Sequence, residues 1–131
     1  MVEIIFKCPE NGGVLHELFT LRYMRYAALS GGYVGRETVI DGRPNLPHGF
    51  HGIHISREAH IGKNVTIYQN VTVGAGHGGA AIIEDDVMIG ANAVIIGGVH
   101  IGAGAKIGAG AIVVDDVMPG KTVVSPKAIA M

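Results

Sequence analysis

An isoleucine or valine recurs at every sixth residue over most of this 131-residue chain, and this period limits the possible folds more than any other feature. The period fits neither an α-helix, which repeats at about 3.6 residues, nor a coiled coil, which repeats at about 3.5. The repeat also extends over too many residues to be a chance spacing of isoleucine and valine in an ordinary valine-rich sheet. The anchor positions are Val34, Ile40 and Leu46, then Ile55, Ile61, Ile67 and Val73, then Ile83, Ile89, Ile95, Ile101, Ile107 and Val113.

A second series supports the same period. The residue four places after most anchors is small or β-branched, as at Ala59, Val65, Val71, Val87, Ala93, Val99, Ala105, Ala111 and Val117. Two inward positions in each six residues define a short strand and a corner, and three such units would close a triangular coil. Glycine follows many anchors, where we expect it to allow tight corners. The sequence predicts an all-β, single-domain parallel β-helix over residues 33–118, with coils about 4.8 Å apart.

The two ends of the chain depart from the repeat. Val14 to Ser30 reads as one helix that ends at Gly31-Gly32, and we expect residues 1–32 to form a helical cap over the open first coil. Pro119-Gly120 breaks the repeat at the other end, so residues 119–131 are expected to form a C-terminal cap. This organisation adds a short N-terminal α-helix to the β-helix.

Composition narrows the function classes. The net charge is −1 and there is no run of Lys or Arg, so nucleic acid is a poor partner. No apolar stretch reaches the roughly 18 residues of a membrane span, and residues 1–10 lack the features of a signal peptide. The single cysteine, Cys8, excludes an internal disulfide. We therefore expect a cytoplasmic protein with no membrane partner.

Two insertions interrupt the repeat, and insertions in a solenoid form surface loops that often bind ligands. The first insertion lies within Leu46 to Ser56 and carries His48, His51 and His54; the second, Gly74 to Ala81, carries His77. A histidine is a natural general base near neutral pH. His16, His60 and His100 are expected to be solvated surface side chains, and His54 shares the phase of His60 and His100. A zinc site built from His48, His51 and His77 is an alternative, but histidines spaced so loosely are weak support for it.

The segments LPHGFHGIHIS, IYQNVTVG and GAGAKIGAGAIV together resemble the catalytic domain of the serine acetyltransferases and other hexapeptide-repeat acyltransferases, over roughly Leu46 to Val124. The resemblance implies a left-handed coil, a homotrimer with active sites between subunits, and acetyl transfer from acetyl-CoA to a small hydroxyl acceptor without a metal. It implies His48 as the general base and CoA contacts at Ala75, Ala91, Lys106 and Ala109. His77, the histidine of the second insertion, is the other candidate catalytic residue.

The chain departs from the family pattern at two places. Pro47 stands where family members carry an aspartate that orients the base, and Gly79 and Ala80 stand where many carry an Arg-His pair. Whether His77 replaces the histidine absent at Ala80 is left open by the sequence. L-serine is the expected acceptor, and a saccharide hydroxyl is the nearest alternative. A metal-dependent protein of the carbonic anhydrase type and an inactive structural module are the further alternatives.

Overall fold

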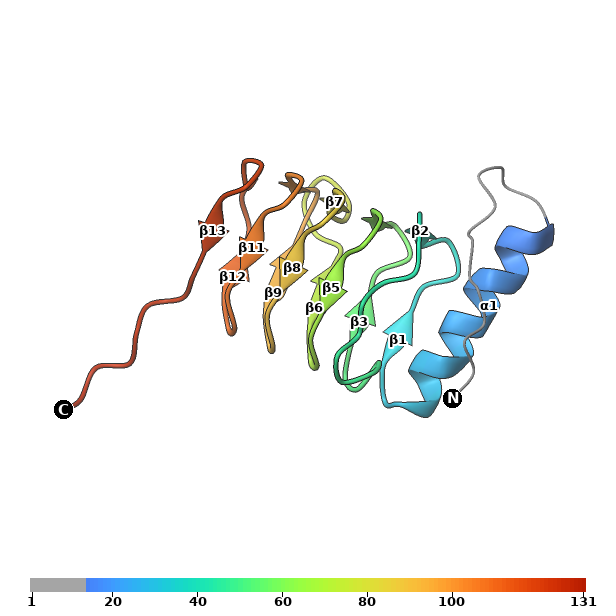
Figure 1. The fold of residues 1–131 in the computed structure, drawn as a ribbon, viewed down its shortest axis with the longest axis horizontal. Coiled ribbons are helices and arrows are strands. Elements are labelled where there is room, and N and C mark those ends of the chain that lie inside the picture. The colour runs from blue at the N-terminus through green and yellow to red at the C-terminus, as the bar shows by residue number, and fades with distance from the viewer. Residues whose placement is uncertain (1–13) are drawn as a thin grey trace.

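The computed structural model describes residues 14–131, which form a parallel β-solenoid preceded by one helix (Figure 1). The coil is left-handed, as the resemblance implies. The helix is α1 (Val14–Leu29). The strands are β1 (Tyr33–Val34), β2 (Val39–Ile40), β3 (His54–Ile55), β4 (His60–Ile61), β5 (Thr66–Ile67), β6 (Thr72–Gly74), β7 (Ile82–Ile83), β8 (Met88–Ile89), β9 (Val94–Ile96), β10 (His100–Ile101), β11 (Lys106–Ile107), β12 (Ile112–Val113) and β13 (Thr122–Val123).

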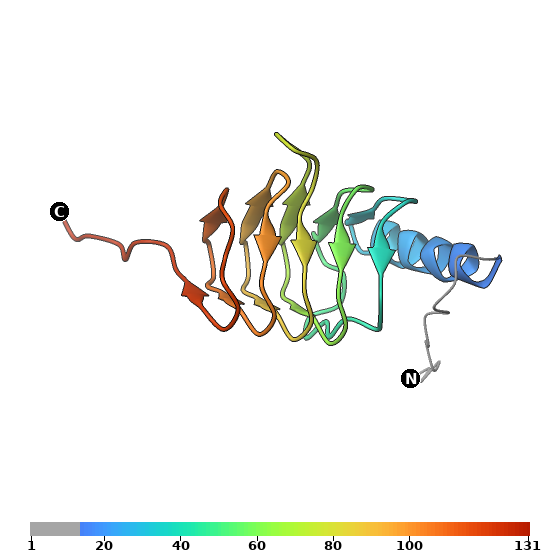
Figure 2. The same ribbon diagram turned by 90° about the horizontal axis from the view of Figure 1, so that it is seen from above.

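The strands stack into three parallel sheets, one for each side of the coil (Figure 2). The first sheet has the order β1-β3-β6-β9-β12, the second β2-β4-β7-β10 and the third β5-β8-β11-β13. Partner residues are 18 apart where the repeat is unbroken, as for His54 and Thr72, and 22 apart across the second insertion, as for Thr72 and Val94. Both insertions therefore bulge outward while the register of the coil is kept.

Anchor residues fill the interior of the coil. Eight of the predicted isoleucine anchors, Ile55 to Ile107, are at most 1% exposed, and the second inward series from Ala59 to Val117 is also buried. Each two-residue strand turns its first residue outward and its second inward, which is the alternation of a pleated strand. Among the anchors, Leu46 is the exception to this burial: it is only half-buried, and its rung forms no strand but an isolated bridge between Asn45 and Thr66.

The glycines that follow the anchors serve a different purpose from the one expected. A Cβ on Gly90 would lie 2.6 Å from the backbone nitrogen of Ala109, and one on Gly62 would lie 2.7 Å from the carbonyl carbon of Glu84. Neither glycine has a positive φ; the left-handed corner positions are held by other residues, such as Asn64 and Asn92 with φ of 55° and 61°. Glycine follows the anchor because the next coil passes too close for a side chain.

Helix α1 lies over the first coil and packs against β1 (Figure 1). Phe19, Tyr23 and Ala27 turn inward and are buried. The helix ends in a Schellman motif, because Gly31 adopts φ +71° and the N–H of Gly32 donates to the carbonyl of Ala27 at 2.7 Å. Residues 1–13 of the expected cap lie outside the described residues.

The C-terminal segment differs from the expected cap. The solenoid continues past residue 118, because Thr122 and Val123 pair in parallel with Lys106 and Ile107 of β11. After β13 the chain leaves the coil as an extended, exposed tail (Figures 1 and 2). The offset between partners is 16 residues here, as it is for the bridge between Ile101 and Val117, two fewer than in the regular coil. Val123 is therefore out of phase with the anchors that end at Val113.

Candidate active site

The first insertion forms an ordered loop at the edge between the third and first sheets. Phe50 and Ile53 are fully buried and anchor this loop in the coil, while Gly49 and Gly52 adopt φ of 68° and 65°. The N–H of Gly49 donates to the carbonyl of Leu46 at 3.1 Å, which closes a turn around residues 47–48. The loop therefore presents an exposed side chain, His48, from a fixed backbone.

Two side chains of the next coil hold the His48 ring. Its Nδ1 lies 2.7 Å from Oε1 of Gln69, and its ring meets that of Tyr68 edge to face, with centroids 5.9 Å apart and planes at 79°. Gln69 therefore contacts the ring of His48, which in the family pattern is oriented by the aspartate that stands at the position of Pro47. The sequence did not identify Gln69, because a 21-residue offset between coils brings it to His48.

Helix α1 supports this loop through an aromatic cluster. The ring of Phe50 packs edge to face against Tyr26 at 5.2 Å and against Tyr23 at 5.5 Å, and Tyr23 in turn packs against Phe19 at 4.9 Å. Such pairs stabilise by about 0.5–1.5 kcal/mol beyond the burial of their area. The terminal helix thus covers the first coil and also fixes the residue two places after His48.

The second insertion forms a hairpin that projects from the edge between the first and second sheets (Figure 2). Gly76 and Gly79 exchange backbone hydrogen bonds of 2.7 and 3.1 Å, which leaves His77 exposed at the tip. The base of the hairpin is buried at Ala80, which is 8% exposed. His77 and the corners at 96–99 and 114–116 line a hollow of about 500 Å³ that includes Asp115 and Asp116.

The predicted site residues divide between two edges of the coil. The His48 edge, which joins the third sheet to the first, consists of residues 46–53, 68–71, 90–93 and 108–111 and therefore carries Ala91 and Ala109. The His77 edge, which joins the first sheet to the second, includes residues 75–81 and carries Ala75. A single chain does not bring His48 and His77 to the same edge.

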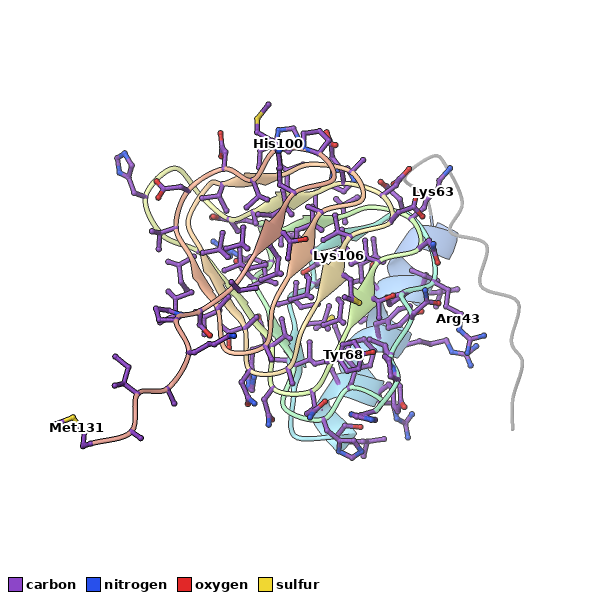
Figure 3. The ribbon with its side chains drawn as sticks, turned by 60° about the vertical axis from the view of Figure 1, so that its left-hand side comes forward. Arg43, Lys63, Tyr68, His100, Lys106 and Met131 are labelled. Carbon is purple, nitrogen blue, oxygen red and sulfur yellow. The ribbon has the colours of Figure 1, made fainter. Side chains whose placement is uncertain are left out.

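Lys106 lies on the third sheet, beside the His48 edge. It is the outward residue of β11 and is exposed between Met88 and Thr122. In Figure 3, Lys106 and Tyr68 lie on the right-hand part of the coil and His100 lies at its top, on the second sheet. Three of the four residues expected to contact CoA therefore lie along or beside the edge that carries His48.

Successive corners stack closely along the His48 edge. The N–H of Asn92 donates to the carbonyl of Gln69 at 3.1 Å, and the N–H of Gly110 donates to that of Ala91 at 2.8 Å. Gly90 allows this approach because no side chain could fit against the backbone of Ala109. The corners at 90–93 and 108–111 consequently form a strip of backbone with mostly small side chains, against which an extended ligand could lie.

The second sheet carries two histidine–carboxylate pairs away from both insertions. Nε2 of His60 lies 2.6 Å from Oδ2 of Asp41, and Nε2 of His100 lies 2.7 Å from Oε1 of Glu84. The backbone N–H of Ala103 and the His100 ring, in that order, lower the pKa of the Glu84 carboxyl from its ordinary value of 4.5. His60 and His100 project outward as predicted, but each is paired with an acid.

Neither a cluster of metal-binding side chains nor a membrane-spanning helix occurs in the part of the chain that the structure describes. Within residues 14–131, no three or more His, Cys, Asp or Glu side chains come together as a metal site would require. His48 and His51 share one loop, whereas His77 lies on another edge. In the same part of the chain, no helix has both the length and the apolar character to span a membrane.

Comparison with known proteins identifies relatives of this arrangement. Residues 80–115 match the family described as bacterial transferase hexapeptide (six repeats). The serine acetyltransferase of Bacillus licheniformis is 41% identical over 99 residues, which cover 72% of this chain and 42% of the relative. A tetrahydropyridine-dicarboxylate N-acetyltransferase of Clostridium perfringens is 53% identical over 47 residues, 36% of this chain and 20% of the relative. The chain thus spans less than half the length of these relatives.

Solved structures extend the likeness over more of the chain. Soybean serine acetyltransferase complexed with serine superposes with a TM-score of 0.73 at 34% identity, over 86% of this chain and 48% of that one. The Neisseria gonorrhoeae serine acetyltransferase in complex with serine gives a TM-score of 0.68 at 33% identity, over 88% and 56% of the two chains. Over most of its length the chain is therefore similar to the hexapeptide-repeat transferases, and among them to the serine acetyltransferases.

Proposed function

We propose that this chain transfers an acetyl group from acetyl-CoA to a small hydroxyl acceptor, with His48 as the general base. One observation carries the proposal: the exposed ring of His48 is held through Nδ1 by Gln69, which leaves Nε2 without a hydrogen-bond partner among the described residues. A histidine held in this way is prepared to accept a proton. The likeness to serine acetyltransferases supplies the reaction class.

The proposed chemistry is a direct transfer. Nε2 of His48 removes the proton of the acceptor hydroxyl while its oxygen bonds to the thioester carbonyl carbon. Backbone N–H groups stabilise the resulting oxyanion. The carbon–sulfur bond then breaks, and the CoA sulfur takes the proton from His48, so the products are an acetyl ester and free CoA thiol. His48 is thereby restored to its neutral form, and no metal takes part in the proposed step.

Acetyl-CoA is proposed to lie along the His48 edge. Ala91 and Ala109 present small side chains on stacked corners there, and Lys106 supplies a cation on the adjoining sheet. A lysine is a suitable partner for the phosphates of CoA. Ala75 belongs to the other edge and would serve a CoA molecule bound there by its own chain or by a neighbour.

A homotrimer would unite the two edges. Because His48 and His77 lie on different edges of one chain, a site that uses both must form between subunits, with the His48 edge of one facing the His77 edge of the next. Cyclic symmetry would repeat that heterologous interface and close it into a ring. The use of acetyl-CoA leads us to place the protein in the cytoplasm.

L-serine is the first candidate acceptor, because two of the similar solved proteins are described in complex with serine. A saccharide hydroxyl is the second candidate, because Gly79 and Ala80 leave the base of the second insertion without the Arg-His pair of the family. The test follows free thiol released from acetyl-CoA while serine, homoserine and a panel of sugars are supplied in turn. Turnover with serine alone supports the first candidate, and turnover with sugars alone supports the second. Release of no thiol with any acceptor would contradict the proposed activity.

A further inference from the structure

Gln69 occupies the position from which the tautomer of His48 can be controlled. Its Oε1 lies 2.7 Å from Nδ1 of the ring. An amide oxygen only accepts hydrogen bonds, so this contact requires Nδ1 to carry the proton. The neutral ring then bears its lone pair on Nε2, which is the form that a general base at Nε2 needs.

Gln69 is fixed by the coil rather than by the loop that it contacts. Its carbonyl accepts the N–H of Asn92 at 3.1 Å, and the neighbouring N–H of Tyr68 donates to the carbonyl of Ile89 at 3.0 Å. The side chain is also partly shielded from solvent. The backbone from which the Gln69 side chain reaches the ring is therefore fixed, and a histidine's ring orientation and tautomer are commonly set by the hydrogen bond of its other nitrogen.

We infer that Gln69 is the positioning residue for His48, holding it as the Nδ1-protonated tautomer in place of the aspartate that Pro47 displaces. This inference rests on the proposed function and deepens it. Gln69 does not touch the reacting atoms; it acts through His48. An amide supplies orientation without negative charge, so the proton that His48 gains during transfer is not stabilised by a neighbouring carboxylate.

The side chains around His48 are consistent with a ring that is held by an uncharged partner. Tyr68 faces it from the corner after β5, and Tyr26 of α1 approaches the same loop, with Oη 3.1 Å from where a Cβ of Gly49 would lie. His51 belongs to the loop itself and His54 begins β3, with Nδ1 of His54 lying 3.0 Å from the carbonyl oxygen of Gly52. Among the side chains that the structure describes, none with a carboxylate is ion-paired with His48.

Two substitutions separate orientation from charge. Gln69→Met keeps the length of the side chain but removes the acceptor, so kcat for thiol release should fall by about tenfold or more with little change in KM for acetyl-CoA. Gln69→Glu keeps an acceptor and adds a negative charge. It should retain most of kcat and move the acidic limb of the kcat/KM–pH profile upward by about one unit, because an opposite charge favours the protonated ring.

Nitrogen-15 NMR of the intact protein tests the inference without any activity. Neutral His48, assigned by comparison with His48→Ala, should give the Nδ1–H correlation pattern in the wild type and a mixed or Nε2–H pattern in Gln69→Met. A wild-type ring protonated at Nε2, or a pattern unchanged in Gln69→Met, would overturn the inference. So would a Gln69→Glu profile whose acidic limb stays in place. Because the tautomer is read directly, this result is distinct from a failure of the acetyltransferase assay.

Discussion

Phe50 and Tyr26 pack edge to face, with ring centroids 5.2 Å apart and planes at 88°, and this contact joins the loop that carries His48 to helix α1. Phe50 is fully buried although it belongs to an insertion, and it lies two residues from the proposed base. The terminal helix therefore bears on the site and does more than cover the first coil. This arrangement leads to the first prediction.

Replacing Phe50 should damage activity beyond its effect on stability. Phe50→Ala should lower the free energy of unfolding by about 3–5 kcal/mol, because it leaves a cavity among Tyr23, Tyr26 and the first coil. Phe50→Leu fills more of the space and should remain folded, yet release thiol more slowly because the His48 loop is less well fixed. Thermal unfolding and thiol release measure the two effects. Leu29→Ala on the exposed part of α1 is the control, and equal activity of Phe50→Leu and the wild type would refute the link.

The close stacking of corners predicts opposite tolerances at two glycines. Gly90→Ala should destabilise the protein by about 1–3 kcal/mol, because its Cβ would meet the backbone of Ala109. Gly104→Asn should change stability by no more than about 0.5 kcal/mol, because its corner is open and asparagine accepts a positive φ. Denaturant midpoints of the two variants test this order. A reversed order would contradict the conclusion that crowding between coils dictates glycine at the positions after the anchors.

These glycines illustrate what the sequence could and could not predict. The six-residue period located the buried anchors from Val34 to Val113, apart from the half-buried Leu46, because one buried anchor per strand produces a regular apolar series in the sequence. The expectation that these glycines allow tight corners was wrong, because crowding between coils depends on residues 18 or more places away in the sequence. The period also missed β13, since the coil is two residues shorter between Val113 and Val117, which moves Val123 out of phase with the anchors that end at Val113.

Only part of the candidate site could be predicted from the sequence, because some of its contacts join residues on successive coils. The insertions reveal themselves as breaks in the period, so His48 and His77 could be singled out. The partner of His48 could not, because Gln69 reaches it through stacking of one coil on the next. Nor could the period alone show that the two histidines lie on different edges, which depends on the sheet to which each insertion is attached.

The pairing of Glu84 predicts a modest acid sensitivity. The Ala103 N–H and the His100 ring lower the pKa of Glu84, so its contribution to stability is complete above the ordinary value and is lost as the pH falls through the lowered pKa. Between about pH 5 and pH 3, the wild type should therefore lose more thermal stability than Glu84→Gln. The difference should be small because the pair is exposed. Glu58→Gln is the control, and melting curves that fall in parallel for Glu84→Gln and the wild type would contradict the account.

Mixed oligomers test whether the site forms between subunits. If His48 of one subunit works with His77 of the next, His48→Ala and His77→Ala should each lose activity alone. Equal amounts that are unfolded and reassembled together should then recover up to about a quarter of wild-type activity, because a quarter of the interfaces would hold both histidines. Thiol release before and after reassembly gives the measurement. No recovery from mixed oligomers that do form would place the working site within one chain.

The role of His48 as the base is the central claim, and thiol release by His48→Ala tests it most directly. With acetyl-CoA and the best acceptor, the variant should lose about 10²- to 10⁴-fold in kcat while its melting temperature stays near that of the wild type, because His48 is exposed. His51→Ala, three residues away on the same loop, should retain activity. Thiol release by His48→Ala at the wild-type rate would contradict the account.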